Sequence, residues 1–145
     1  MRKSKVAMKP RPFIICDLAG GGYHIFVSLE VEGKRARFLI DTGASSCVVD
    51  RLFYESKLGR KMKVVKKETT GVHSTVMESY SGSLKLLKIG AIEYRRLYVA
   101  GVELSHVNMT YKKLGIPPIH GIIGSDLMLK YGWILNYRDK QIEFS

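Results

Sequence analysis

The sequence predicts a single all-β domain that carries one or two short helices. The chain has 145 residues, which is the length of one domain. Its β-prone runs are short and are separated by turn-forming residues, as in proteins built from many strands. Apolar residues make up 46% of the chain and charged residues 26%, a balance typical of a protein that buries a hydrophobic core.

The first predicted element is a hairpin that ends at an acidic residue. Residues 23–31 alternate imperfectly between apolar and polar side chains, and Glu32 and Gly33 then form a turn. Residues 34–40 return as the second strand and lead directly into Asp41. The hairpin therefore delivers this carboxylate to the end of a strand.

The rest of the chain is interpreted from the same signals. A strand is expected at 48–52, and a hairpin at 67–80 has Gly71 near its tip. The remaining predicted elements are strands at 84–89 and 94–100, which pair across Gly90 and Ala91, short helices at 104–114 and 125–131, and a closing hairpin at 132–144 around Arg138 and Asp139.

Two parts of the chain are distinguished by composition, an arm at residues 1–12 and a domain at 13–145. The arm is basic and is expected to be flexible. No apolar segment with a small-residue cleavage site follows it, so we predict no secretory signal. The apolar runs are too short to span a membrane. We therefore expect a cytoplasmic protein without a membrane partner.

The most informative motif is Asp41-Thr42-Gly43, which follows the apolar residues Phe38, Leu39 and Ile40. By itself the triplet is weak evidence of function, because most such triplets are plain junctions between a strand and a turn. A second motif strengthens it, because Ile122, Ile123 and Gly124 precede a short predicted helix that begins at Ser125.

Together the two motifs resemble those of the retropepsin-like aspartic proteases, the retroviral-type family, and the chain looks like a bacterial-type single-domain member. The similarity covers about residues 23–144. It implies a closed-barrel-like acid protease fold that forms half of a two-fold symmetric dimer. It also implies that Ile122, Ile123 and Gly124 pack beneath the catalytic loop.

The resemblance implies an aspartic endopeptidase that cleaves polypeptides. The chain contains one Asp-Thr-Gly triplet, whereas the two-lobed enzymes carry two, so the second carboxylate must come from a second subunit. The two Asp41 side chains would then share one proton and activate one water. This chemistry requires neither a metal nor a cofactor.

The residues after Asp41 are assigned supporting roles by the same resemblance. The Thr42 hydroxyl is expected to form a hydrogen bond across the dimer axis, and Gly43 to give backbone N–H groups access to the carboxylate. Ala44 and Ser45 are expected to keep the loop narrow. The simpler alternative is that Thr42 caps a turn and that Gly43 permits a positive φ.

A flap that covers the substrate is expected from the hairpin at 67–80. The residues assigned to substrate contact are Thr70, Gly71, Val72 and His73, although an exposed turn histidine is the alternative for the last. Flap closure would exclude bulk water from the shared proton.

The cysteines and histidines do not indicate a metal site. Cys16 and Cys47 are too few and too far apart for a disulfide scaffold or a metal knuckle, and Cys47 is expected to be a small buried hydrophobic residue. The four histidines do not have the spacing of zinc ligands. We predict no metal.

The positive charge of the chain leaves a nucleic-acid-binding function open. Basic residues outnumber acidic ones by 24 to 13, a net charge of +11, and they cluster in the arm and at 57–67. Such runs can bind nucleic acid, although most are solvated surface and we do not favour nucleic acid as a partner. The alternatives to a homodimeric protease are a non-catalytic peptide-binding dimer and a nucleic-acid-binding β-domain.

Overall fold

The computed structural model describes residues 8–70 and 75–144, without the side chains of residues 66–70 and 75–78. Its strands are β1 (Arg11–Pro12), β2 (Ile14–Asp17), β3 (Tyr23–Val31), β4 (Lys34–Ile40), β5 (Val48–Asp50), β6 (Lys63–Thr70), β7 (Thr75–Ile89), β8 (Ile92–Val102), β9 (Gly121–Ile123), β10 (Ile134–Asn136) and β11 (Gln141–Glu143). Its helices are α1 (Arg51–Leu58), α2 (Ser105–Lys113) and α3 (Ser125–Lys130).

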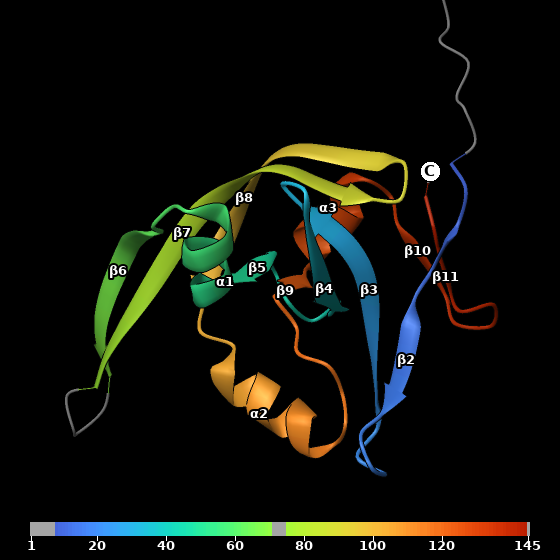
Figure 1. The fold of residues 1–145 in the computed structure, drawn as a ribbon, viewed down its shortest axis with the longest axis horizontal. Helices are drawn as coiled ribbons and strands as arrows, with labels where there is room; N and C mark the ends of the chain where they lie inside the picture. The colour runs from blue at the N-terminus through green and yellow to red at the C-terminus, as the bar shows by residue number, and fades with distance from the viewer. Residues whose placement is uncertain (1–7, 71–74, 145) are drawn as a thin grey trace, which may run out of the picture.

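The main sheet closes into a β-barrel. Its strand order is β2-β3-β4-β9-β5-β8-β7-β6, and an additional antiparallel pairing joins β3 to β7 through Glu30 and Lys88. Strands β3, β4, β9, β5, β8 and β7 therefore form a closed ring of six, with β2 and β6 as extensions (Figure 1). The predicted all-β fold with a closed barrel and short helices is confirmed.

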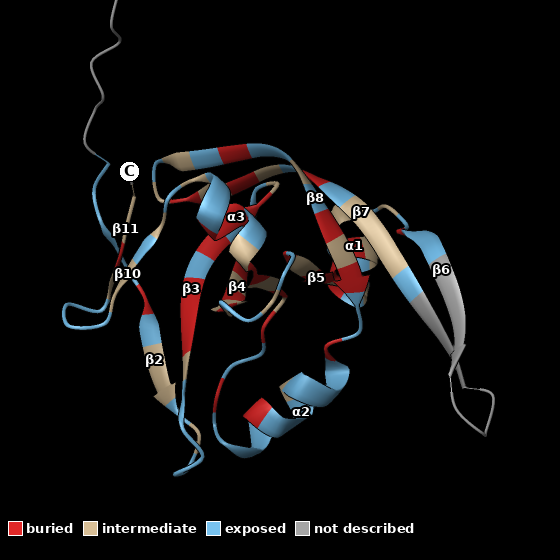
Figure 2. Ribbon diagram, turned by 180° about the vertical axis from the view of Figure 1, so that it is seen from behind, coloured by how far each residue is buried: buried red, intermediate tan, exposed pale blue. Residues whose placement is uncertain are grey.

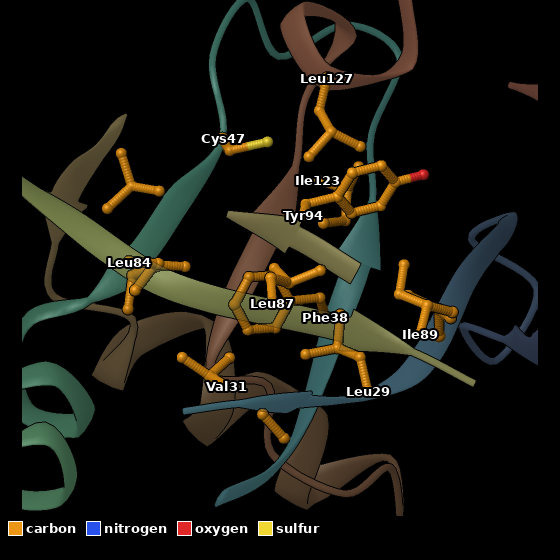
Figure 3. Packing of buried hydrophobic residues seen from close by; sticks show 14 of the residues in the cluster. Leu29, Val31, Phe38, Cys47, Leu84, Leu87, Ile89, Tyr94, Ile123 and Leu127 are labelled. Carbon is orange, nitrogen blue, oxygen red and sulfur yellow. The ribbon is translucent and has the colours of Figure 1, made fainter. Parts of the chain in front are cut away.

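Alternation along the strands fills the barrel. In β3, Ile25, Val27, Leu29 and Val31 are buried, whereas Ser28 and Glu30 are exposed. Figure 3 shows the inward side chains of several strands meeting in one cluster, to which α3 adds Leu127. Fully buried members of this cluster include Val31, Val49, Phe38, Leu84, Leu87, Ile89 and Ile123.

A second, smaller cluster lies between α2 and the outer side of the barrel. It contains Phe26, Leu104, Tyr111, Ile116 and Ile119, and Leu39 and Ile122 pack against it. Most of α2 is exposed, with Tyr111 as its buried residue (Figure 2). This packing fixes the helix beside the end of β4, from which Asp41 follows.

The two ends of the described chain meet in a separate sheet of order β1-β11-β10. Arg11 is opposite Ile142 and Pro12 is opposite Gln141. The β-structure thus includes the last two residues of the segment 1–12 that the sequence assigns to the arm. The short strand β2, which pairs with β3, is also absent from the sequence prediction.

Most predicted elements are present, and one prediction is partly wrong. The hairpin at 23–40, the pairing across Gly90 and Ala91, both helices and the closing hairpin are confirmed. The strand expected at 48–52 ends at Asp50 instead, and α1 begins at Arg51. The Asp50 carboxylate accepts a hydrogen bond from the Phe53 N–H, so it caps a helix that the local β-propensity does not predict.

One long strand joins the barrel to the predicted flap. β7 runs without interruption from Thr75 to Ile89, so the hairpin expected at 67–80 and the strand expected at 84–89 share it. Within the described part of the chain, no helix has both the length and the apolar character needed to cross a membrane.

Candidate active site

The loop of residues 41–47 crosses the end of β9. β4 runs parallel to β9, with Ile40 opposite Ile123, and β5 runs antiparallel to it, with Val48 opposite Ile122. The chain must therefore pass from one side of β9 to the other between Ile40 and Val48. The Asp41 N–H donates to the Ile123 carbonyl at 3.0 Å and so continues the ladder by one residue.

The Asp41 carboxylate is held by its own loop. The Gly43 N–H donates to Asp41 Oδ1 at 2.9 Å, and a Cβ at Gly43 would lie 3.2 Å from the same oxygen. Gly43 does not have a positive φ, so the close approach of its backbone is the feature that favours glycine here. Asp41 is half-buried and Thr42 is exposed. None of the hydrogen bonds among the described residues uses the Thr42 hydroxyl.

The glycine motif packs directly beneath this loop. The Ser125 N–H and its hydroxyl both donate to the Ala44 carbonyl, at 2.8 and 3.0 Å. A Cβ at Gly124 would lie 2.5 Å from the carbonyl carbon of Ser46 and 2.9 Å from the Ala44 oxygen. Such distances do not occur for real side chains, so the contact between β9 and the loop requires glycine at 124.

Asp126 provides a further attachment that the sequence analysis did not identify. Its carboxylate accepts hydrogen bonds from the Cys47 N–H at 3.2 Å and from the Cys47 thiol at 3.3 Å. The Gly124 N–H in turn donates to the Cys47 sulfur at 3.4 Å. Cys47 is buried, as predicted, and burial is the main reason that its pKa is raised to about 12. The thiol therefore remains protonated and serves as a donor.

A cavity of about 240 Å³ lies beside Asp41. Among the described residues that line it, Asp41 alone carries a carboxylate. The lining residues are Tyr23, His24, Ile25, Leu39, Ile40, Asp41, Thr42, Leu135 and Tyr137. The cavity thus lies between the loop of residues 41–47, the start of β3, and β10 with the turn that follows it.

His24 lines this cavity and contacts Tyr111, and the sequence analysis identified neither residue. His24 Nδ1 lies 2.7 Å from the Tyr111 hydroxyl, and their rings meet edge to face. Burial is the main cause of a raised pKa for Tyr111, so its hydroxyl stays protonated at neutral pH. The only sequence signal is the position of His24 in β3, one residue before Ile25, which is paired with Ile40.

A comparison with protein families shows to which family the chain belongs. The model of a family described as aspartyl protease matches residues 27–127, which include Asp41 and the glycine motif. The chain belongs to the aspartyl protease family. No curated protein matches the sequence significantly.

Solved structures show which fold this aspartyl protease family member has. It is similar to a retropepsin-like aspartic protease from Rickettsia conorii, with a TM-score of 0.60, 18% identity, and coverage of 94% of this chain and 96% of the other. It is also similar to the retroviral protease-like domain of Ddi1 from Leishmania major, with a TM-score of 0.50, 14% identity, and coverage of 83% and 92%. The fold is therefore retropepsin-like, as the two motifs predicted.

The hairpin that the sequence analysis assigned to a flap is present in the described backbone of this family member. β6 and β7 are paired from Lys63 opposite Ser81 to Thr70 opposite Thr75. The hairpin projects from the barrel on the side of α1 (Figure 1). Thr70 is the last residue of β6, and the other predicted contact residues, Gly71, Val72 and His73, lie outside the described residues.

Within residues 8–70 and 75–144, excluding the undescribed side chains, no group of three or more His, Cys, Asp or Glu side chains could hold a metal ion.

Proposed function

We propose that the protein is a homodimeric aspartic endopeptidase in which the Asp41 carboxylates of two subunits form one active site. The observation that carries the proposal is the position of Asp41. It is half-exposed at the start of a firmly anchored loop, and it is the one carboxylate beside its cavity among the described lining residues. A two-carboxylate mechanism therefore needs a second copy of this chain.

The chemistry follows from two carboxylates that lie close together. Two like charges at hydrogen-bond distance cannot both ionise, so the pair holds one proton and titrates as a unit. The ionised Asp41 takes a proton from water as the water attacks the scissile carbonyl, and the protonated Asp41 donates to the developing oxyanion. The Gly43 N–H, at 2.9 Å from Asp41 Oδ1, fixes the orientation of the carboxylate.

Several separate hydrogen bonds hold the loop of residues 41–47 in place for this role. Ala44 is tied to Ser125, and Cys47 is tied to Asp126 and Gly124. These contacts limit how far Asp41 can move when substrate binds, and correct placement of reacting groups contributes much of a catalyst's rate. The exposed Thr42, whose hydroxyl has no described partner, would lie beside its counterpart in the second subunit.

The substrate class is an extended polypeptide with apolar side chains. Aromatic and aliphatic residues such as Tyr23, Leu135 and Tyr137 line the cavity beside Asp41 and suit apolar side chains. We assign the β6–β7 hairpin, including Thr70 and residues 71–73, to cover the bound peptide and exclude water.

The test is cleavage of a mixed peptide library, read by mass spectrometry for the wild type and for Asp41→Asn. The substitution keeps the shape of the side chain but removes its ability to act as a base. We expect cleavage to be lost in Asp41→Asn and retained in Glu93→Gln, which changes an exposed carboxylate on β8. Equal cleavage by Asp41→Asn and the wild type would refute the proposal.

A mixing experiment tests the shared site separately. A fixed amount of wild type is equilibrated with an equal amount of Asp41→Asn, and cleavage is measured. If subunits exchange at random and both carboxylates are required, half of the wild-type chains enter inactive pairs, so activity falls to about one half. Unchanged activity would show that one chain is sufficient. Glu93→Gln is the control partner, and because it is itself active we expect cleavage to rise to about twice that of the wild type alone.

A further inference from the structure

A larger cavity lies away from Asp41 and has a different character. It has a volume of about 590 Å³ and shares no lining residue with the cavity beside Asp41. Its walls come from the outer faces of β3 and β4, the turn between β7 and β8, and the segment before β9. Four of the side chains that line it are cationic, namely Arg11, Arg35, Arg37 and Lys88, whereas Glu30 is the one carboxylate.

These cations are not neutralised within the described structure. The ion pairs among the described side chains join Arg51, Arg60 and Arg95 to acidic residues, and none of them involves the four cavity cations. Glu30 lies opposite both Arg35 and Lys88 in the sheet but forms an ion pair with neither. Four positive charges against one negative charge leave a local excess of three. Such an excess favours an anion that carries more than one charge.

One of the arginines that line this cavity, Arg37, is held in place, but one of its donors has no acceptor. The Arg37 guanidinium lies over the Phe26 ring at 4.3 Å, and Nη2 donates to the Cys16 sulfur at 3.6 Å, a weak acceptor. Arg37 Nε is buried and has no partner in the described structure. A buried donor without an acceptor is costly, so it gains when an acceptor arrives.

The surrounding backbone fixes the shape of the cavity. The Arg37 N–H donates to His120 Nδ1 at 3.0 Å, and the His120 N–H donates to the Arg37 carbonyl at 2.8 Å. Because Nδ1 accepts, the neutral ring carries its proton on Nε2 and retains a donor. On the opposite wall, a Cβ at Gly90 would lie 2.7 Å from Arg11 Nε, so glycine allows the Arg11 side chain to lie against the β7–β8 turn.

We propose that this cavity binds an anion with two or more phosphate groups, in the size range from pyrophosphate to a nucleotide. Guanidinium groups match the oxygen geometry of phosphate, and a lysine adds charge without fixed geometry. The volume falls within the usual range for small-molecule sites. This site does not depend on the proposed peptidase activity, because it stands on residues outside the Asp41 cavity.

The experiment titrates wild-type protein by calorimetry with pyrophosphate, with ATP and with a short single-stranded oligonucleotide, at one fixed salt concentration. The test variant is Arg35→Gln with Lys88→Gln. The control is Lys112→Gln with Lys113→Gln, which removes the same charge from exposed positions on α2. We expect the test variant to bind pyrophosphate and ATP about tenfold or more weakly, since charge-assisted hydrogen bonds are lost. The control is expected to bind as the wild type does.

The results of the titrations identify the ligand or overturn the proposal. Tighter binding of ATP than of pyrophosphate would assign a nucleotide, and equal binding would assign the phosphates alone. Absence of pyrophosphate and ATP binding in the wild type would overturn the proposal, as would equal weakening in test and control variants. Binding of the oligonucleotide alone would also overturn it, because the charge would then act as a surface-wide nucleic-acid contact. Amide NMR shifts at Ala36 and His120, without shifts at Asp41, are expected when pyrophosphate is added.

Discussion

Gly124, which directly follows β9, packs against the backbone of the Asp41 loop. Its Cα hydrogen occupies the space in which any other residue would place a Cβ, 2.5 Å from the backbone of Ser46. The obstacle is backbone rather than a flexible side chain, so the loop itself must move to accept a larger residue. That loop carries Asp41, and a shift of the loop displaces the carboxylate.

We therefore expect Gly124→Ala to reduce peptide cleavage strongly and to lower the free energy of unfolding by about 1–3 kcal/mol, as overpacking of a filled site does. Urea unfolding and the cleavage assay measure the two effects. Leu129→Ala is the control, because Leu129 is on the adjacent helix but is 86% exposed. Wild-type stability in Gly124→Ala would contradict the close contact.

An ion pair between Arg60 and Glu32 connects several elements of the barrel. Arg60, which follows α1, makes two hydrogen bonds to the Glu32 carboxylate at 2.7 and 2.8 Å and a third to the Ser83 carbonyl at 2.9 Å. The Lys85 N–H also donates to Glu32. The group links the β3–β4 turn to α1 and to β7, which continues into the hairpin assigned to the flap.

This hydrogen-bonded group makes the stability of the fold depend on pH. The hydrogen bonds from Arg60 are the main cause that holds the pKa of Glu32 below its ordinary value of 4.5. Above that value Glu32 is ionised in both the folded and the unfolded protein, and its full contribution to stability is present. As the pH falls through 4.5 and then through the lower folded-state pKa, the unfolded protein binds the proton first and the contribution is lost.

We expect Glu32→Gln to lower the urea midpoint at pH 7 and to have a smaller effect near pH 3. Midpoints at the two pH values, for wild type and variant, provide the measurement. The control is Glu93→Gln, because the Glu93–Arg95 pair is exposed and is expected to contribute little at either pH. An effect of Glu32→Gln that is equal at both pH values would refute the assignment.

At the scale of the whole molecule, the proposed enzyme is complete only as a dimer. Cleavage per chain should then rise with protein concentration until the dimer is fully formed, since the monomer holds half of the site. The measurement is specific activity over a dilution series, with sedimentation of the same samples as the control for assembly. Constant specific activity in samples that sediment as monomers would exclude a shared site.

The fold also determines where positive charge is concentrated on the molecule. The sequence shows basic runs at 1–12 and 57–67, but the cations of the larger cavity come from three separate strands, β1, β4 and β7. Only Arg11 belongs to either run. The grouping of Arg35, Arg37 and Lys88 depends on the β3–β4 hairpin and on the closure of β3 against β7.

The sequence by itself determined the features that depend on neighbouring residues. Strands 23–31 and 34–40, the turn at Glu32 and Gly33, and the Asp-Thr-Gly and Ile-Ile-Gly motifs follow from local alternation, turn chemistry and residue type. These motifs were sufficient to predict the fold and the position of Asp41 at the end of a strand. Helix α1 was not predicted because Val48 and Val49 favour a strand that was extended to residue 52, although Asp50 is a residue type that caps helices.

Only the tertiary structure decided which distant residues meet. The parallel pairing of β4 with β9 brings Gly124 and Asp126 under the loop, and α2 brings Tyr111 to His24. No local pattern encodes these contacts, because they depend on the register between strands far apart in the chain and on the closure of the barrel. The sequence therefore indicates the chemistry of Asp41. The closed barrel determines which distant residues hold the Asp41 loop in place.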